Sequence, residues 1–174
     1  MKETESRPSG VIVSCEDLVH CCVARKMIDE DMMLVPGIGM GVEYNPESVL
    51  GKFGLAQLDK KSGEIVATMG FVIERGEMII TQTPQAKRPT KLSKGARSRL
   101  RSREFRVAMI NQLLGIAKEM GFGRVGGVLA KDYGNVLAGV ADYYYVAERV
   151  DDVFEEAGFL YNKEMDLYIK DLIS

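Results

Sequence analysis

The densest group of charged side chains in the sequence is basic and lies between positions 87 and 106. Nine Lys and Arg residues stand there against one acid, Glu104, so the stretch carries a net charge of +8 while the rest of the chain carries −10. A compact positive segment on an acidic chain favours a small polyanion or a self-complementary contact over a broad nucleic-acid surface. A solvated loop is the alternative interpretation. The basic residues are Lys87, Arg88, Lys91, Lys94, Arg97, Arg99, Arg101, Arg103 and Arg106.

This basic segment leads directly into a predicted helix. Ser102 can cap a helix that reaches Met120, because apolar residues recur along it every three or four positions and Gly121 follows as a stop. Backbone N–H groups and the helix dipole at such an N-terminus attract phosphoryl groups, and Arg and Lys add charge-assisted hydrogen bonds. We therefore expect phosphate binding where the segment meets the helix.

Metal and disulfide chemistry is not indicated. Cys15, Cys21 and Cys22 are an odd number of cysteines, and His20 is the only histidine. All four fall in one predicted helix, where adjacent side chains point about 100° apart and cannot converge on an ion. The sequence thus predicts reduced thiols and no metal site.

The order of the expected elements indicates an α/β (α+β) fold. After a helix that begins at Ser14 come three strands joined by short turns, which makes neighbouring strands antiparallel. A helix over 102–120, a strand over 124–130, a helix over 140–157 and a closing strand through Leu172 follow. We expect a mixed, mainly antiparallel central sheet flanked by helices. The first three strands are expected at 53–58, 64–74 and 77–83.

Several local signals refine this order. Pro84 is expected to end the third strand, and the turn at 45–48 to open a short helix through Leu50. The Gly-rich run 37–41 is expected to be a loop that binds no cofactor. The glycines of the strand after the long helix suggest close approach by a neighbouring group. Tyr143 falls on the apolar stripe of the following helix and is expected in the core.

The length of 174 residues suits one domain, and 46% hydrophobic with 28% charged residues is typical of globular proteins. We expect residues 1–10 to be a flexible leader and residues 11–174 to form a single domain. No apolar stretch approaches the roughly 20 residues that a membrane helix needs. Residues 1–10 do not resemble a signal peptide. We therefore predict a cytoplasmic protein that does not contact a membrane.

This order, together with four stretches of sequence, resembles the GNAT superfamily of N-acetyltransferases. Residues 58–73, LDKKSGEIVATMGFVI, look like the second and third strands of such proteins, and residues 77–83 like the fourth. The basic connection would then be the cofactor loop, and INQLLGIAKEMGF, residues 110–122, looks like the helix that follows it. VFEEAGF, residues 153–159, resembles the closing helix that precedes the last strand.

The resemblance implies a GNAT-like fold and the transfer of an acyl group from acetyl-CoA or another acyl-CoA to an amine. The acceptor would be a small molecule or a protein, and a homodimer is compatible with the family. Splayed strands would hold the cofactor while the basic connection clamps its phosphates. The residues assigned to cofactor binding are Thr81, Thr83, Lys94, Gly95, Ala96, Arg97, Arg99, Arg101, Ser102 and Arg103.

The resemblance also suggests catalytic residues, although Phe154 stands where the family often has a tyrosine that protonates the leaving thiolate. Tyr144, from the run of three tyrosines, could substitute for it. Asn135 resembles the family's asparagine after the strand, with a helix N-cap as its alternative role. Glu77 is the available base on the fourth strand, with an exposed strand-end glutamate as the alternative.

Two other functions stay open. A catalytically inactive GNAT-fold binding or interaction module would explain Phe154 and the incomplete glycine pattern around Gly95. Nucleic-acid binding through residues 87–106 is the third candidate, but Phe105 is the only aromatic residue there, so stacking support is thin. We therefore expect nucleic acid not to be the partner.

Overall fold

The computed structural model describes residues 32–36, 49–59, 61–74, 76–86, 92–139 and 141–173. The expected leader, the helix that carries the cysteines and His20, and the Gly-rich run 37–41 lie outside the described residues. The described part is built around one mixed sheet, whose strands run in the spatial order β1-β2-β3-β4-β5-β7-β6. The strands are β1 (Met32–Pro36), β2 (Val49–Leu58), β3 (Ile65–Glu74), β4 (Glu77–Ala86), β5 (Arg124–Gly127), β6 (Leu160–Asn162) and β7 (Leu167–Asp171).

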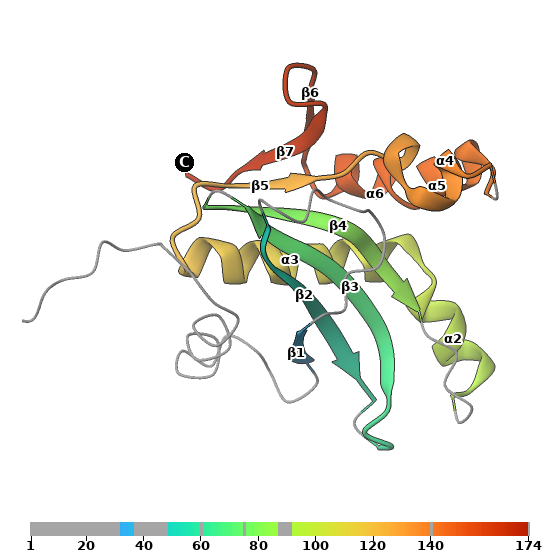
Figure 1. The fold of residues 1–174 in the computed structure, drawn as a ribbon. Coiled ribbons are helices and arrows are strands. Elements are labelled where there is room, and N and C mark those ends of the chain that lie inside the picture. Colours follow the sequence, from blue (N-terminus) through green and yellow to red (C-terminus); the bar gives the residue numbers. More distant parts are fainter. Residues whose placement is uncertain are drawn as a thin grey trace, which may run out of the picture.

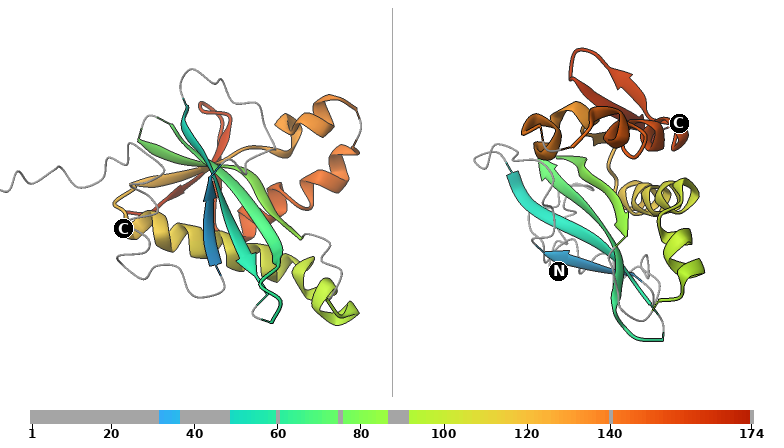
Figure 2. Two further views of the ribbon diagram at one scale, coloured as in Figure 1. Left: turned by 60° about the horizontal axis from the view of Figure 1, so that its bottom comes forward. Right: turned by 90° about the vertical axis from the view of Figure 1, so that its right-hand side faces the viewer.

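The sheet confirms the expected α+β class. β4 and β5 are parallel, whereas every other neighbouring pair of strands is antiparallel. Helices α2 (Lys94–Leu100) and α3 (Arg103–Glu119) lie together on one side of β2, β3 and β4, as the right-hand view of Figure 2 shows. Among the described helices, none combines the length and apolar composition needed to cross a bilayer.

The β2–β3–β4 meander follows the expected strands closely because its turns carry the right residues. Gly63 and Gly76 adopt positive φ values of 67° and 78°, which glycine tolerates without strain. The side chain of Asp59 accepts hydrogen bonds from the Ser62 amide and hydroxyl at 2.9 and 2.8 Å, closing the first turn. The two antiparallel hairpins predicted from these turns are confirmed.

Two predictions about the ends of these strands are wrong. Leu50 belongs to β2 rather than to a short helix, because Val49 already pairs with Glu74 across the sheet. Pro84 does not end β4, which continues to Ala86. The β3–β4 register shifts between Thr68 and Gly70, so Pro84 lies at an irregularity that leaves out a ladder bond that proline cannot donate.

The long helix α3 forms as predicted. The Ser102 hydroxyl caps it by accepting a hydrogen bond from the Phe105 amide at 3.2 Å, and Gly121 ends it with a φ of 85°. Apolar side chains of α3 join those of the sheet in one core. The largest side chains that are fully buried are Phe53, Phe71, Phe154, Phe159, Leu55, Met69, Ile73, Met78, Ile80, Met109 and Ile110.

The region after β5 departs most from expectation. β5 ends at Gly127 rather than at residue 130, and a single helix over 140–157 is wrong. The chain instead forms four short helices before β6 and β7, which form a hairpin in place of one closing strand. Tyr143 is 44% exposed and not in the core. These helices are η1 (Ala130–Asp132), α4 (Gly134–Leu137), α5 (Tyr143–Ala147) and α6 (Asp151–Glu156) (Figure 1).

At the break in the expected helix, a backbone carbonyl accepts a hydrogen bond from the sheet. The Thr83 hydroxyl donates to the carbonyl of Arg149 at 3.2 Å, between α5 and α6. Asp142 caps α5 afresh by accepting from the Tyr145 amide. Tertiary contacts thus override the regular apolar spacing of the sequence.

The expected close approach to the β5 glycines is confirmed and has an identifiable partner. A Cβ on Gly127 would lie 2.5 Å from the ring of Phe154. Phe154 also stacks obliquely on Phe159 and Tyr168, with ring centroids 5.0 and 5.6 Å away. Gly127 therefore lets α6 bury an aromatic ring directly against the sheet.

We expect Gly127→Ala to destabilise the protein by about 1–3 kcal/mol, because the added methyl overpacks a fully buried ring. Denaturant unfolding measures this free energy. Gly95→Ala is the matched control: nothing lies within 4 Å of a Cβ there, so stability should not fall. Equal loss in both variants would contradict the packing account.

Candidate functional site

The candidate site lies where β4 parts from β5. The two strands pair in parallel through Met78, Ile79 and Ile80, and the Val128 amide makes the last bond, to the Ile80 carbonyl at 3.0 Å. Beyond this point β4 keeps only β3 as a neighbour, while the chain after β5 turns into η1. Beyond Ile80, the edge of β4 that faced β5 is therefore not paired with that strand.

Buried polar side chains concentrate on this part of β4. Thr81, Gln82 and Thr83 are 1%, 6% and 2% exposed, and Thr68 on β3 is the fourth buried polar residue among those described. The Thr81 and Thr68 hydroxyls have no hydrogen-bond partner within the described part of the chain. Because a buried polar group without a partner is costly, these hydroxyls mark a place that suits a polar ligand.

Tyr133 closes the gap between the parting strands. Its hydroxyl accepts a hydrogen bond from the Thr83 amide at 3.1 Å, and its side chain is 5% exposed. Burial raises the pKa of Tyr133 to about 12, so the hydroxyl keeps its proton at neutral pH. The site therefore contains a buried proton donor that faces a β4 amide.

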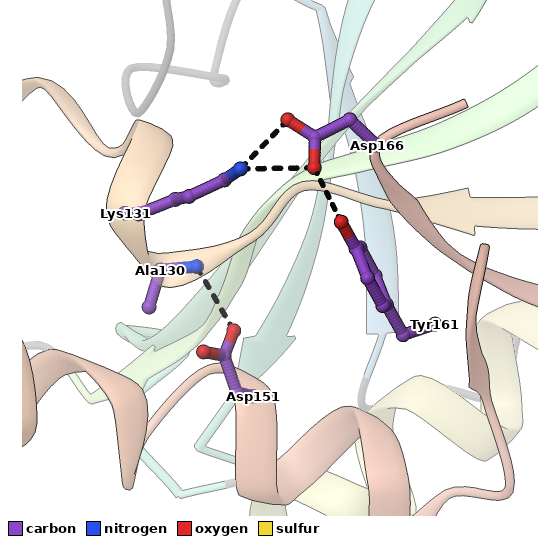
Figure 3. A network of polar contacts seen from close by, with 5 residues as sticks. All are labelled: Ala130, Lys131, Asp151, Tyr161 and Asp166. Carbon is purple, nitrogen blue, oxygen red and sulfur yellow. Dashed lines mark hydrogen bonds and ion pairs between the residues drawn. The ribbon is translucent and has the colours of Figure 1, made fainter. Parts of the chain in front are cut away.

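Two contacts fix the turn that carries Tyr133, and a third supports one of them. The carboxylate of Asp151 accepts from the Ala130 amide at 2.9 Å, as Figure 3 shows. Lys131 forms an ion pair with Asp166 at 2.8 Å, and Tyr161 donates to the same carboxylate at 2.8 Å. Burial raises the pKa of Asp151 above its ordinary value. The turn is thus anchored to α6 and to the β6–β7 hairpin.

A group of arginines lies at the N-terminal turn of α3. Burial and then the positive charge of Arg149 lower the pKa of Arg106, and Arg103 contributes in the same direction. Arg106 Nε is buried and has no partner among the described residues. Arg149 stacks over Tyr145, 3.5 Å from the ring centroid, and donates to the Tyr145 carbonyl. A half-buried guanidinium beside other cations favours a bound anion.

The predicted cofactor residues are divided between the site and α2. Thr81 and Thr83 lie in the site. Arg103 is neutralised, because it pairs with Asp152 at 3.0 Å and Glu156 at 3.8 Å. Ser102 caps α3 and Arg101 caps α2.

The loop expected around Gly95 is instead helix α2, which lies against β4 and α3. Local helix propensity and the Ser93 cap outweigh the single glycine. The predicted residues on this helix are Lys94, Gly95, Ala96, Arg97 and Arg99.

The three predicted catalytic residues are not brought together. Glu77 begins β4 and its carboxylate accepts from Arg124 Nε at 2.9 Å. It is six residues, or about 20 Å, along the strand from Thr83. Tyr144 is 78% exposed on α5. Asn135 lies within α4 rather than before it. Phe154, which stands where the resemblance would imply a tyrosine, is fully buried.

Sequence reasoning missed Tyr133, Arg149 and Asp151, and left Arg106 out of the site. The tyrosine follows the β5 segment by six residues, so its position after the strand was a usable signal. Nothing in the spacing of Arg149 or Asp151 could place them beside β4 or η1, because both lie in a region that was expected to be one regular helix.

Comparison with known proteins assigns no family to this chain. No protein-family model matches the chain, and no curated protein is significantly similar to it.

We expect Tyr133→Phe to destabilise the protein by about 1–3 kcal/mol at neutral pH, because it leaves the buried Thr83 amide without a partner. Since the folded-state pKa is raised from 10 to about 12, the stability that Tyr133 contributes is complete below pH 10 and is lost as the pH rises toward 12. Urea unfolding of both proteins across this range should show the difference shrinking. Tyr144→Phe is the control and should match the wild type throughout.

Proposed function

We propose that the protein is an acyl-CoA-dependent N-acyltransferase with a GNAT-like fold. The observation that carries this proposal is the parting of the parallel strands β4 and β5 after three paired residues, with α3 connecting them. The resemblance of residues 58–73 and 110–122 to the superfamily implies that splayed strands of this kind hold the cofactor. The mixed sheet and its strand order support the same assignment.

Two features of the site fit a nucleotide-tailed thioester. The unpartnered Thr81 hydroxyl can bond the amide-bearing arm of such a molecule where the strands part. Arg106 and Arg149 offer positive charge for its phosphates, and neither has an acidic partner among the described ion pairs. Exposed arginines of α2 add to the positive field nearby.

The residues of the site can perform the proton transfers that acyl transfer requires. A bound acyl-CoA supplies a thioester that an amine can attack. Tyr133 holds a proton at its hydroxyl, and because that oxygen accepts from the Thr83 amide, the proton is free to be donated to a leaving sulfur. Asp151, whose pKa is raised by burial, replaces Glu77 as the proposed base.

Binding without turnover is the second candidate function. It is favoured by Phe154, which is buried against Gly127 where the resemblance would place the acid. The Tyr133 hydroxyl also accepts the hydrogen bond of the Thr83 amide, which a ligand would otherwise bind. A sensor or interaction module would need the phosphate-binding arginines but not a mobile proton.

Isothermal titration calorimetry with acetyl-CoA tests the binding step. Arg106→Gln and Arg149→Gln should each weaken binding about tenfold or more, because each removes a charge-assisted contact to phosphate. Arg106→Gln should leave the free protein at least as stable, since it relieves repulsion between like charges. Lys163→Gln, in the exposed β6–β7 turn, is the control. Absence of heat at high micromolar acetyl-CoA would overturn the proposal.

Thiol release from acetyl-CoA with a panel of amines tests the chemistry. Tyr133→Phe should lower turnover by about 10²- to 10⁴-fold, the usual contribution of a general acid, while leaving acetyl-CoA binding intact. Tyr144→Phe should keep full activity. Tight binding without release of thiol by the wild type would instead assign the protein to the second candidate function.

A further inference from the structure

A separate cavity opens between α2, the first turn of α3 and the end of the β2–β3 hairpin. It encloses about 420 Å³, a size within the range of small-molecule sites. Its lining differs from that of the β4–β5 site, since none of Thr81, Thr83, Tyr133 or Arg106 contributes to it. The apolar lining residues are Leu58, Val66, Leu92, Ala96, Leu100 and Phe105.

The polar groups of this cavity favour an anion. Lys61 and Arg99 are exposed cations on the hairpin and on α2. Asp59 is the one acid of the lining, but its carboxylate already accepts from the Ser62 amide and hydroxyl, and these bonds lower its pKa. Asp59 therefore stays ionised and also attracts Lys61, but with Lys61 and Arg99 the three charged residues of the lining still sum to a net positive charge.

The state of α2 is the second observation. This helix has seven residues, none of them buried, and it contains three basic residues and no acid. A helix this short is not stable by itself, so packing must hold it in place. Ala96 and Leu100 line the cavity. A molecule that filled the space beneath them would complete the packing of α2.

We propose that this cavity binds a small amphipathic anion, with an apolar body against Val66, Leu100 and Phe105 and an anionic head between Lys61 and Arg99. The ligand would stabilise α2 by adding apolar contacts to Ala96 and Leu100. This proposal does not use Thr81, Thr83, Tyr133, Arg106 or Arg149, so it and the acyltransferase proposal can fail separately.

Decanoate is the probe, titrated below its micelle-forming concentration and followed by amide NMR shifts. We expect saturable shifts in α2 and the β2–β3 turn, slower hydrogen exchange of α2 amides, and no saturable shifts with acetate or decyltrimethylammonium. Arg99→Glu should weaken binding by about tenfold, as expected for losing one charge-assisted contact. Arg97→Glu, with the same charge change on the same helix but outside the lining, is the matched control.

Filling the cavity provides an independent check on the fold of the variants. Ala96→Phe should abolish decanoate binding while keeping or raising the unfolding temperature. Binding of the cationic amphiphile as tightly as decanoate, equal effects of Arg97→Glu and Arg99→Glu, or no saturable shift with decanoate would each overturn the proposal. Acetyl-CoA binding measured in Ala96→Phe, which keeps every charge of α2, reports on the β4–β5 site.

Discussion

A buried backbone amide must keep a hydrogen-bond partner, and β4 loses its partner strand beyond Ile80. The rest of the site follows from how the protein meets this constraint. Tyr133 brings a side-chain oxygen to the Thr83 amide, and the Thr83 hydroxyl in turn bonds the Arg149 carbonyl. These two bonds hold η1 and the α5–α6 connection beside β4. The Thr81 hydroxyl, two residues earlier on β4, is buried and has no hydrogen-bond partner among the described residues.

The residues at the opposite end of β4 hold strands together. Glu77 and Arg124 join the first residues of β4 and β5 by an ion pair. Between this pair and the parting of the strands, Gly127 admits the ring of Phe154 and lets α6 cover the sheet closely. A glycine in a central strand and a phenylalanine at its face therefore form one packing unit. The ring of Phe154 is thus part of the core packing.

Sequence patterns predicted the elements whose formation is local. The hairpins of the meander depend on turn residues such as Gly63 and Gly76, and α3 depends on the Ser102 cap and a regular apolar stripe. The region after β5 was predicted poorly because contacts distant in sequence decide it. The Arg149 carbonyl bonds Thr83, 66 residues away. The spacing of residues along the chain does not predict such a contact.

For the same reason, the sequence predicted only some residues of the candidate site. Thr81 and Thr83 could be named because they lie on a recognisable strand. Tyr133, Arg106 and Arg149 come from segments that meet only in the folded molecule. The basic segment 87–106 is divided between two successive helices, which Ser93 and Ser102 cap. The α2 arginines and Arg106 therefore lie on different helices. Charge density along the sequence was therefore a better guide to the region than to the residues.

The ends of the sheet have a consequence for how the protein behaves in a crowded solution. Among the described strands, β1 and β6 lie first and last in the spatial order and are five and three residues long. Short outer strands present few unpaired backbone groups, so another chain has little to extend by strand addition. This brevity disfavours edge-to-edge aggregation even though the middle of the sheet is built from long, strongly apolar strands.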